Sequence, residues 1–329
     1  MISADVPARI AAVKRAKSRQ RGRERLLLVG DSVLGVGERY PLSLAVEKAL
    51  ARTRGRGSRI HVDTMWWPGW AVTSEYCLAD ELVEFDAQRV VLEVNLRSLG
   101  TQALGYPELA GYVRASHFLE ALGLPLDAVG ITANRLLFYR QLVASGAEEA
   151  WTRSIDVQAR FFNLRDKVET AIEQRLHLRA LDERKLLFFA YSMAHYQVPG
   201  KLREQRARVL GSAWGALSGF DPTYPPLRTL GALVRRFSEA KQRPLVWIAP
   251  VNVDYLTSLG IDVSGFDRSA SAVRAVVEAN GGDLLDLHAV LRDAQFADAG
   301  DHATSAGPGQ GTDALARRIV ARILAAEGG

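Results

Sequence analysis

One serine of this chain stands directly after a run of apolar residues, where a buried strand would end. Residues 26–29 read Leu-Leu-Leu-Val, and Gly30, Asp31 and Ser32 follow them. An apolar run that stops at glycine and polar residues is typical of a buried β-strand. A serine hydroxyl becomes a nucleophile when a neighbouring base takes its proton. Ser32 is therefore a candidate nucleophile, provided that other residues supply the base and the donors for an oxyanion.

Two further residues follow predicted strands in the same way. Residues 59–65 alternate and are rich in β-branched side chains, and Gly69 stands in the loop beyond them. The apolar run of residues 89–94 ends at Asn95. In an open parallel sheet, ligands bind beyond the C-terminal ends of the strands, so these residues would share one edge. The backbone N–H groups of Ser32 and Gly69, with the side-chain amide of Asn95, are the candidate oxyanion donors.

The base and its orienting acid are expected in a loop before the last helix. His302 is the candidate base, and a carboxylate on its other ring nitrogen would fix its tautomer. Asp298 lies four residues before His302, and Asp301 is adjacent to it. Because neighbouring side chains pair poorly with each other's rings, Asp298 is the expected partner and Asp301 the alternative. A histidine in a surface loop is the competing interpretation of His302.

Strand and helix patterns alternate in the first hundred residues and again after residue 226. The predicted strands cover residues 25–29, 59–65, 89–94, 244–249 and 283–287. The predicted helices cover residues 38–52, 71–85, 227–242, 266–279 and 313–326. Such alternation indicates parallel strands with helices on both faces of the sheet. We therefore predict an α/β fold, a three-layer sandwich around a parallel five-stranded sheet.

The middle of the chain has no convincing pair of strands, and helical patterns dominate it. It is interpreted as an insertion that forms a lid or an acceptor site. The sequence then divides into a basic leader at residues 1–25, an α/β catalytic domain made of residues 26–99 and 227–329, and a mostly helical insertion at residues 100–226.

Charge and composition limit the partners of the protein. Much of the net charge of +5 comes from the leader, where no aromatic residue is interleaved to stack on bases, so nucleic-acid binding is not expected. The one cysteine, Cys77, has no partner for an intrachain disulfide and is expected to be a small buried residue. Neither metal-ligand spacing nor a phosphate-binding glycine loop occurs, so we predict no cofactor and no metal.

Signals for export or membrane insertion are also missing from the sequence. The basic stretch is not followed by the apolar segment of a signal peptide, and no run of about 18 apolar residues occurs. A cytoplasmic protein without a transmembrane segment is the expectation. The oligomeric state stays open.

These blocks together resemble the SGNH/GDSL hydrolase superfamily. The resemblance rests on Gly30-Asp31-Ser32 after the first strand, a lone Gly69 after the second, Asn95 after the third and the Asp/His loop before the last helix. It implies a flavodoxin-like three-layer fold that hydrolyses or transfers acyl groups. By this resemblance Ser32 is the nucleophile, Gly69 and Asn95 are oxyanion donors, and His302 is the base.

Two blocks depart from the family pattern. The third block is usually Gly-x-Asn-Asp, whereas this chain has Glu93-Val94-Asn95-Leu96. The last block is usually Asp-x-x-His, and that spacing falls on Ala299, one residue after Asp298.

Side chains beside the blocks have two interpretations each. Trp66, Trp67 and Trp70 either line an acyl pocket or pack in the core. Arg97 is expected to be solvated, and the alternative is that it binds an anionic group of the substrate.

The sequence therefore predicts serine-dependent hydrolysis of an ester, an O-acyl group on a small molecule, sugar or lipid. The reaction would pass through an acyl-enzyme on Ser32, with His302 as base. One alternative is an O-acyltransferase, in which a bound alcohol replaces water at the same site. The other is a non-catalytic binding module on an SGNH fold.

Overall fold

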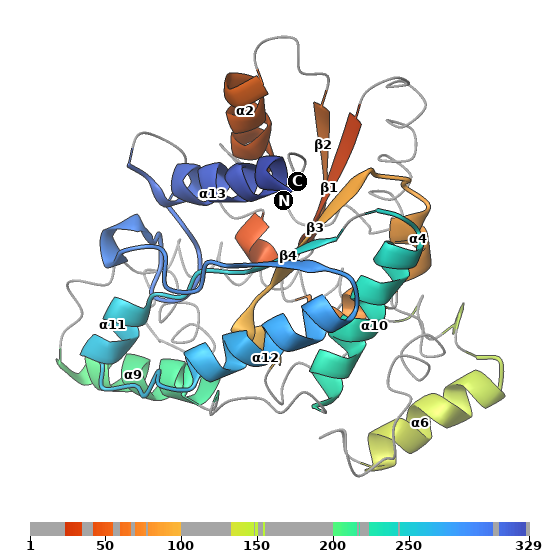
Figure 1. Cartoon of the computed structure of the whole chain (residues 1–329). Helices are drawn as coiled ribbons and strands as arrows, with labels where there is room; N and C mark the ends of the chain where they lie inside the picture. The colour runs from red at the N-terminus through yellow and green to blue at the C-terminus, as the bar shows by residue number, and fades with distance from the viewer. Residues whose placement is uncertain are drawn as a thin grey trace, which may run out of the picture.

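A single parallel sheet of five strands forms the centre of the described structure (Figure 1). The computed structural model describes residues 24–34, 42–54, 60–66, 70–76, 78–99, 133–147, 149–150, 154, 200–215, 217, 224–242, 244–304 and 309–326. The strands are β1 (Glu24–Gly30), β2 (Ile60–Trp66), β3 (Arg89–Val94), β4 (Leu245–Ile248) and β5 (Asp283–Asp286). Their order in the sheet is β2-β1-β3-β4-β5, the flavodoxin-like order, so the predicted α/β architecture is confirmed.

Alternate residues of the strands face two separate apolar cores. Leu26 and Leu28 of β1 belong to one core, and Leu27 and Val29 belong to the other. Successive side chains of a strand point to opposite faces, so a strand that is apolar throughout must be covered on both sides. The continuous apolar run before Gly30 therefore fits a central position in the sheet.

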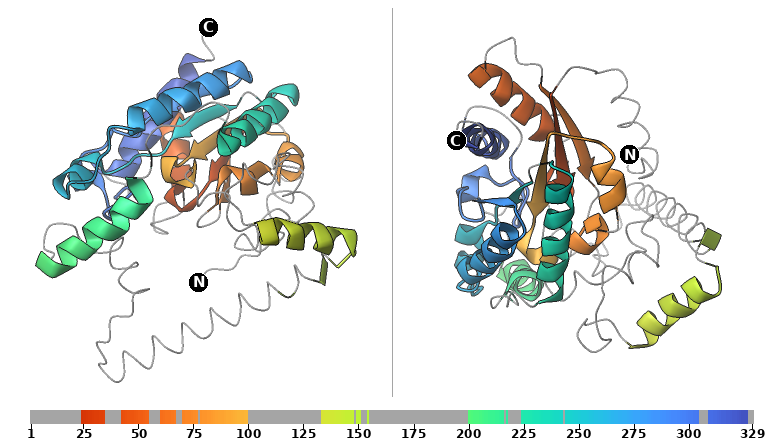
Figure 2. Two further views of the ribbon diagram at one scale, coloured as in Figure 1. Left: turned by 90° about the horizontal axis from the view of Figure 1, so that it is seen from below. Right: turned by 45° about the vertical axis from the view of Figure 1, so that its right-hand side comes forward.

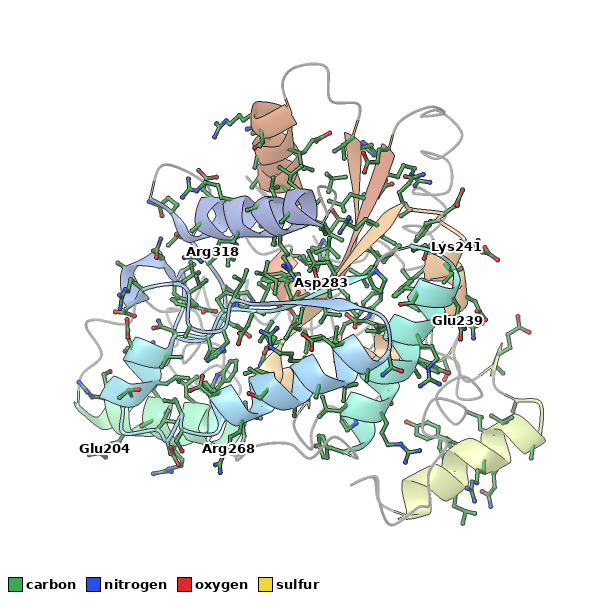
Figure 3. All side chains as sticks on the ribbon, in the orientation of Figure 1. Glu204, Glu239, Lys241, Arg268, Asp283 and Arg318 are labelled. Atoms are coloured by element: carbon green, nitrogen blue, oxygen red, sulfur yellow. The ribbon has the colours of Figure 1, made fainter. Side chains whose placement is uncertain are left out.

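Helices cover both faces of this sheet. The first core lies under α2 (Leu42–Arg54) and α13 (Gly311–Ala325), which pack side by side (Figures 1 and 2). The second core lies under α3 (Val72–Tyr76), α4 (Ala79–Val83), α10 (Pro225–Glu239) and α12 (Phe266–Ala279). Charged side chains such as Glu239, Arg268 and Arg318 lie on the outer sides of these helices (Figure 3).

Three further helices and three 3-10 turns complete the described elements. They are α6 (Ala133–Ala144), α9 (Gly200–Trp214), α11 (Val253–Ser258) and the 3-10 turns η1 (Ser32–Leu34), η2 (Leu96–Leu99) and η6 (Asp293–Gln295). No helix in the described ranges is long and apolar enough to cross a membrane.

Two predicted helices differ from the structure. Residues 71–85, expected as one helix, form the two short helices α3 and α4. The helix expected from residue 227 begins two residues earlier, at Pro225. Proline is favoured in the first turn of a helix, where its missing N–H removes no hydrogen bond.

Several predictions from the sequence lie outside the described residues. These are Gly69, Trp67, Cys77, most of the leader and residues 101–132 and 155–199 of the predicted insertion. Of that insertion, the described part contains α6 and α9.

A buried ion pair joins the first two strands. Arg25 Nη2 lies 2.6 Å from Asp63 Oδ2, and Arg25 Nε lies 3.1 Å from the same oxygen. Each of the two side chains is only 6% exposed. Arg25 also donates to the Phe85 carbonyl at 2.8 Å, so this guanidinium links β1, β2 and the segment after α4.

We expect Asp63→Ala to lower the free energy of unfolding by about 3–5 kcal/mol, because it leaves a buried guanidinium without its counter-charge. Urea unfolding measures this change. The control is Glu278→Ala, which removes an exposed ion pair with Arg274 and should change stability by no more than about 0.5 kcal/mol. Equal effects of the two substitutions would contradict the structural role of the buried pair.

Candidate active site

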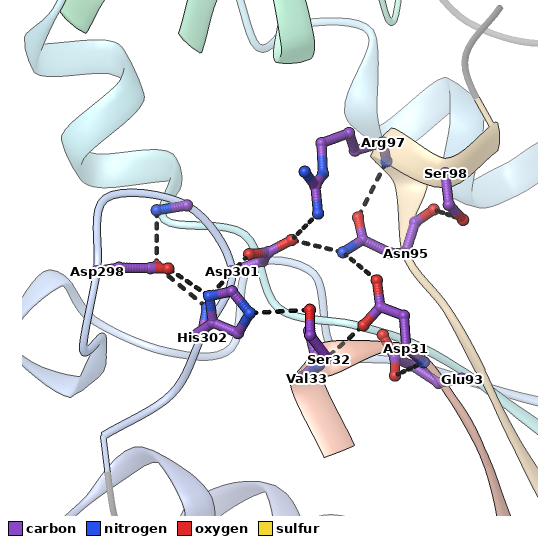
Figure 4. Close-up of polar contacts among 11 residues, drawn as sticks. Asp31, Ser32, Val33, Glu93, Asn95, Arg97, Ser98, Asp298, Asp301 and His302 are labelled. Atoms are coloured by element: carbon purple, nitrogen blue, oxygen red, sulfur yellow. Dashed lines mark hydrogen bonds and ion pairs between the residues drawn. The ribbon is translucent and has the colours of Figure 1, made fainter. Parts of the chain in front are cut away.

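The C-terminal edge of the sheet brings together three segments that are far apart in the sequence. Ser32 follows β1, Asn95 follows β3, and His302 lies in the loop after β5 (Figure 4). Parallel strands all end at one edge, which is why the topology alone places these residues near one another.

Ser32, His302 and Asp298 form a continuous chain of hydrogen bonds. His302 Nε2 lies 3.0 Å from Ser32 Oγ, and His302 Nδ1 is in direct contact with Asp298 Oδ2. The other oxygen of Asp298 accepts the backbone N–H groups of Gly300 at 2.9 Å and of His302 at 3.2 Å. These bonds fix the carboxylate against the imidazole. The arrangement is that of a nucleophile, a base and an acid that orients the base.

The loop that carries His302 is held by its own backbone. The N–H of Ala297 donates to the His302 carbonyl at 2.7 Å, and an antiparallel bridge joins Phe296 and Ala303. Asn252 at the start of α11 donates its N–H to the Gly300 carbonyl at 2.8 Å. His302 is therefore part of an ordered loop within the site, and its interpretation as a surface-loop histidine is wrong.

Asp301 is a second carboxylate at the same imidazole. Its Oδ1 lies 3.4 Å from His302 Nδ1, farther away than Asp298. Its Oδ2 accepts Asn95 Nδ2 at 2.6 Å and Arg97 Nη2 at 3.1 Å. Arg97 is therefore an ion-pair partner inside the site, and its interpretation as a simply solvated arginine is wrong.

Both amide hydrogens of Asn95 face carboxylates. One donates to Asp301, and the other points to Asp31 Oδ2 at 3.5 Å, the limit of a hydrogen bond. An oxyanion-donor role for Asn95 therefore requires this long contact to be exchanged for the oxygen of the substrate. Gly69, whose N–H is another predicted oxyanion donor, lies outside the described residues.

The charges around the imidazole favour its protonated form. Burial by itself would lower the pKa of His302, but Asp301 and Asp298 outweigh it and raise that pKa to about 9. Burial would also raise the pKa of Asp301, but Arg97 and the His302 imidazole hold it below its usual value. The site therefore contains a carboxylate kept ionised by two cationic partners.

A second set of acids lies behind Ser32, and their pKa values are raised, whereas that of Asp301 is lowered. Burial raises the pKa of Glu93 and of Glu75 well above the usual value, and the nearby Asp31 carboxylate raises both further. Burial and the charge of Asp301 also raise the pKa of Asp31. Sequence reasoning did not assign a role to Glu93 or Glu75. The departure of Glu93 from the family's glycine was the signal that could have found one of them.

Only one group of described side chains has ligand atoms close enough to hold a metal ion. It consists of Asp298, Asp301 and His302, whose atoms lie within 4.8 Å of one another. In the structure, Nδ1 of the imidazole is bonded directly to Asp298. The arrangement fits an acid–base pair better than a metal site.

The tryptophans near the site separate into different environments. Trp70 is 2% exposed and belongs to the core under α10 and α12, so packing is its role. Trp66, at the end of β2, packs partly against the core under α2 and α13.

Comparison with known proteins adds little to this geometry. No protein-family model matches the chain, and no curated protein matches its sequence. Among solved structures, it is similar to LAE5, an α/β hydrolase enzyme from the metagenome of Lake Arreo, Spain, with a TM-score of 0.43 and 12% identity. That alignment covers 91% of this chain and 94% of the other.

We expect the His302 imidazole to titrate with a pKa of about 9 in the folded protein. The unfolded imidazole titrates near 6.5, so the stabilisation of roughly 3 kcal/mol is fully present below pH 6.5 and is lost as the pH rises through about 9. NMR of labelled histidine measures the pKa, with His302→Gln assigning the signal. Asp301→Asn should move the pKa down towards 6.5. A wild-type pKa that is already near 6.5 would contradict the assigned charges.

Proposed function

We propose that this protein is a serine-dependent esterase that forms an acyl-enzyme on Ser32. The observation that carries the proposal is the chain of contacts from Ser32 Oγ through both nitrogens of His302 to Asp298. A hydroxyl, an imidazole and a carboxylate in this order are what acyl transfer to a serine requires. The likeness of the sequence blocks to the SGNH/GDSL superfamily supports the same proposal.

In the first half of the proposed reaction, His302 Nε2 takes the proton of Ser32 as Oγ attacks the ester carbonyl carbon. The oxygen of the tetrahedral intermediate receives the Ser32 N–H and the Asn95 amide. The imidazolium then gives its proton to the leaving alcohol, the ester C–O bond breaks, and an acyl-Ser32 remains. In the second half, water loses a proton to His302 and attacks the acyl carbon. The bond from this carbon to Ser32 Oγ then breaks, the acid leaves, and the imidazolium returns the proton to Oγ.

The two carboxylates act on the imidazolium that forms in each half. Asp298 holds Nδ1–H and so keeps Nε2 directed to Ser32. Asp301 adds a second negative charge near the same nitrogen. The two negative charges stabilise the His302 imidazolium that forms during the reaction. They also keep His302 protonated in the resting protein at neutral pH. The free base, and with it the activity, should therefore increase towards pH 9.

An acyltransferase is the close alternative, because a bound alcohol and water can attack the same acyl-enzyme. We assign the predicted insertion at residues 100–226 to the lid or acceptor site. Its described helix α9 reaches the site through Trp214, whose ring lies 5.7 Å from the Arg97 guanidinium carbon.

We expect a fluorophosphonate probe to label Ser32 and not the Ser32→Ala variant. His302→Ala should slow labelling by at least about 100-fold because no base remains. The wild-type rate should rise with pH up to about 9. The control is His288→Gln. His288 pairs with Asp286 and Asp267 and is not part of the chain formed by Ser32, His302 and Asp298, so this variant should label like wild type. Folded wild-type protein that does not label would overturn the proposal and favour the binding module.

Esterase and transferase are separated by the products of p-nitrophenyl acetate in the presence of glycerol. For an esterase we expect one acetate for each p-nitrophenol released, because water is the acceptor. Chromatographic measurement of acetate, set against the absorbance of the phenol, gives this ratio. Release of phenol in clear excess of acetate, with acetylated glycerol as product, would assign the transferase instead.

A further inference from the structure

A side chain of β3, not the backbone pairing between β1 and β3, bonds to the turn that carries Ser32. The paired residues of β1 and β3 end at Val29 and Leu92. Beyond that point the backbone N–H of Asp31 donates to Glu93 Oε2 at 3.0 Å. Glu93 is 3% exposed, so this bond is shielded from water.

The same side chain fills the space above Gly30. A Cβ atom at Gly30 would lie 2.4 Å from Glu93 Oε2 and 2.5 Å from Glu93 Cβ. Contacts this short do not occur, so the side chain at 93 demands glycine at 30. The two residues preceding Ser32 are thus both fixed by Glu93, one by a hydrogen bond and one by close packing.

Asp31 passes this constraint on to the nucleophile. Its Oδ1 accepts the N–H of Val33 at 2.8 Å, and its carbonyl accepts the N–H of Leu34 at 3.3 Å. These bonds close the turn η1 around Ser32. A shift of the Asp31 backbone would therefore move Ser32 Oγ relative to His302.

We infer that Glu93 is a positioning residue that fixes the turn bearing Ser32 at hydrogen-bond distance from His302. This inference rests on the proposed function. It also gives a physical reason for the departure of the third block from the family's glycine, because here the side chain at 93 contacts the backbone before the nucleophile.

Glu93 performs this role as a neutral carboxylic acid. It faces Asp31 beyond the end of β1 and Glu75 on α3, and burial together with these two acids raises its pKa well above the usual value. Its Oε1 has no hydrogen-bond partner in the described part of the chain, as fits a group that carries no charge. Glutamine is therefore its closest substitute, since the amide oxygen can accept the same N–H.

The test compares fluorophosphonate labelling rates of Glu93→Gln and Glu93→Ala at a temperature where both are folded. We expect Glu93→Ala to label on the order of 10- to 100-fold more slowly, because Ser32 loses its alignment. Glu93→Gln should restore the rate to within about threefold of wild type, because the accepting oxygen is kept. A purely structural role would lower the Tm of Glu93→Ala without slowing labelling of the folded protein.

A double substitution separates packing from hydrogen bonding. Gly30→Ala alone should unfold the protein or lower its Tm strongly, whereas Gly30→Ala in the Glu93→Gly background should be tolerated. The next nearest atom to such a Cβ is at the flexible end of Leu34, at 3.0 Å. We expect the double variant to recover the Tm that Gly30→Ala alone loses. It should still label as slowly as Glu93→Ala, because the hydrogen bond to Asp31 is absent in both.

The pH dependence of the Tm tests the neutral state of Glu93. An unfolded glutamate loses its proton near pH 4.5, whereas folded Glu93 keeps it, so wild type should lose stability as the pH rises above 4.5. Glu93→Gln removes this loss, so its Tm should rise relative to wild type as the pH rises above 4.5.

The outcomes distinguish this inference from the proposed function. If wild type labels and Glu93→Ala labels at the same rate, the positioning role is wrong and the esterase proposal stands. If folded wild type does not label at all, the esterase proposal fails and the positioning role fails with it. A Tm of Glu93→Gln that follows wild type at every pH would contradict the neutral state.

Discussion

A carboxylate with no exposed surface, Asp301, determines how the other polar groups of the site are arranged. A buried charge is tolerated only when charged or hydrogen-bonding partners compensate it. Asn95 and Arg97 from the end of β3 supply two of these partners, and His302 supplies the third. Their side chains are therefore oriented by Asp301 before any ligand arrives.

The acids around Ser32 divide into two groups with opposite protonation. Asp301 lies beside cations that favour its ionised form, whereas Glu93 and Glu75 lie in apolar surroundings beside another acid. Environments that push the pKa values of neighbouring groups apart are typical of acid–base sites. Here the ionised group faces the base, and the neutral group supports the backbone behind the nucleophile.

Asp31 connects the backbone turn at Ser32 with the charged side chains of the site. Its N–H is held by Glu93, and its carboxylate approaches the Asn95 amide. A change at Glu93 or Asn95, both at the C-terminal end of β3, is thus transmitted to the turn that carries Ser32. Arg97 extends the network to α9, since its guanidinium lies over the ring of Trp214.

The sequence by itself determined the architecture and most of the residues that meet at the site. Apolar runs that end in Gly30 and Asn95 identify parallel strands, and parallel strands place their C-terminal ends together, so the meeting of Ser32, Asn95 and His302 follows from topology. The adjacency of Asp301 to His302 in the chain also favoured Asp298 as the closer partner of the imidazole, as the structure has it. The predicted helix ends at residue 227 and across residues 71–85 differ from the structure, where one helix starts at Pro225 and α3 and α4 are separate.

Only the tertiary structure decided which polar side chains bond to one another and in which charge state. Asp301 turns to Asn95 and Arg97, which are about two hundred residues away in the chain, and no local pattern encodes that contact. Burial likewise decides that Glu93 keeps its proton, since an identical residue on the surface would be ionised. The sequence pattern specifies which residues lie at the edge of the sheet. Their burial and their neighbours there determine their protonation states and their hydrogen bonds.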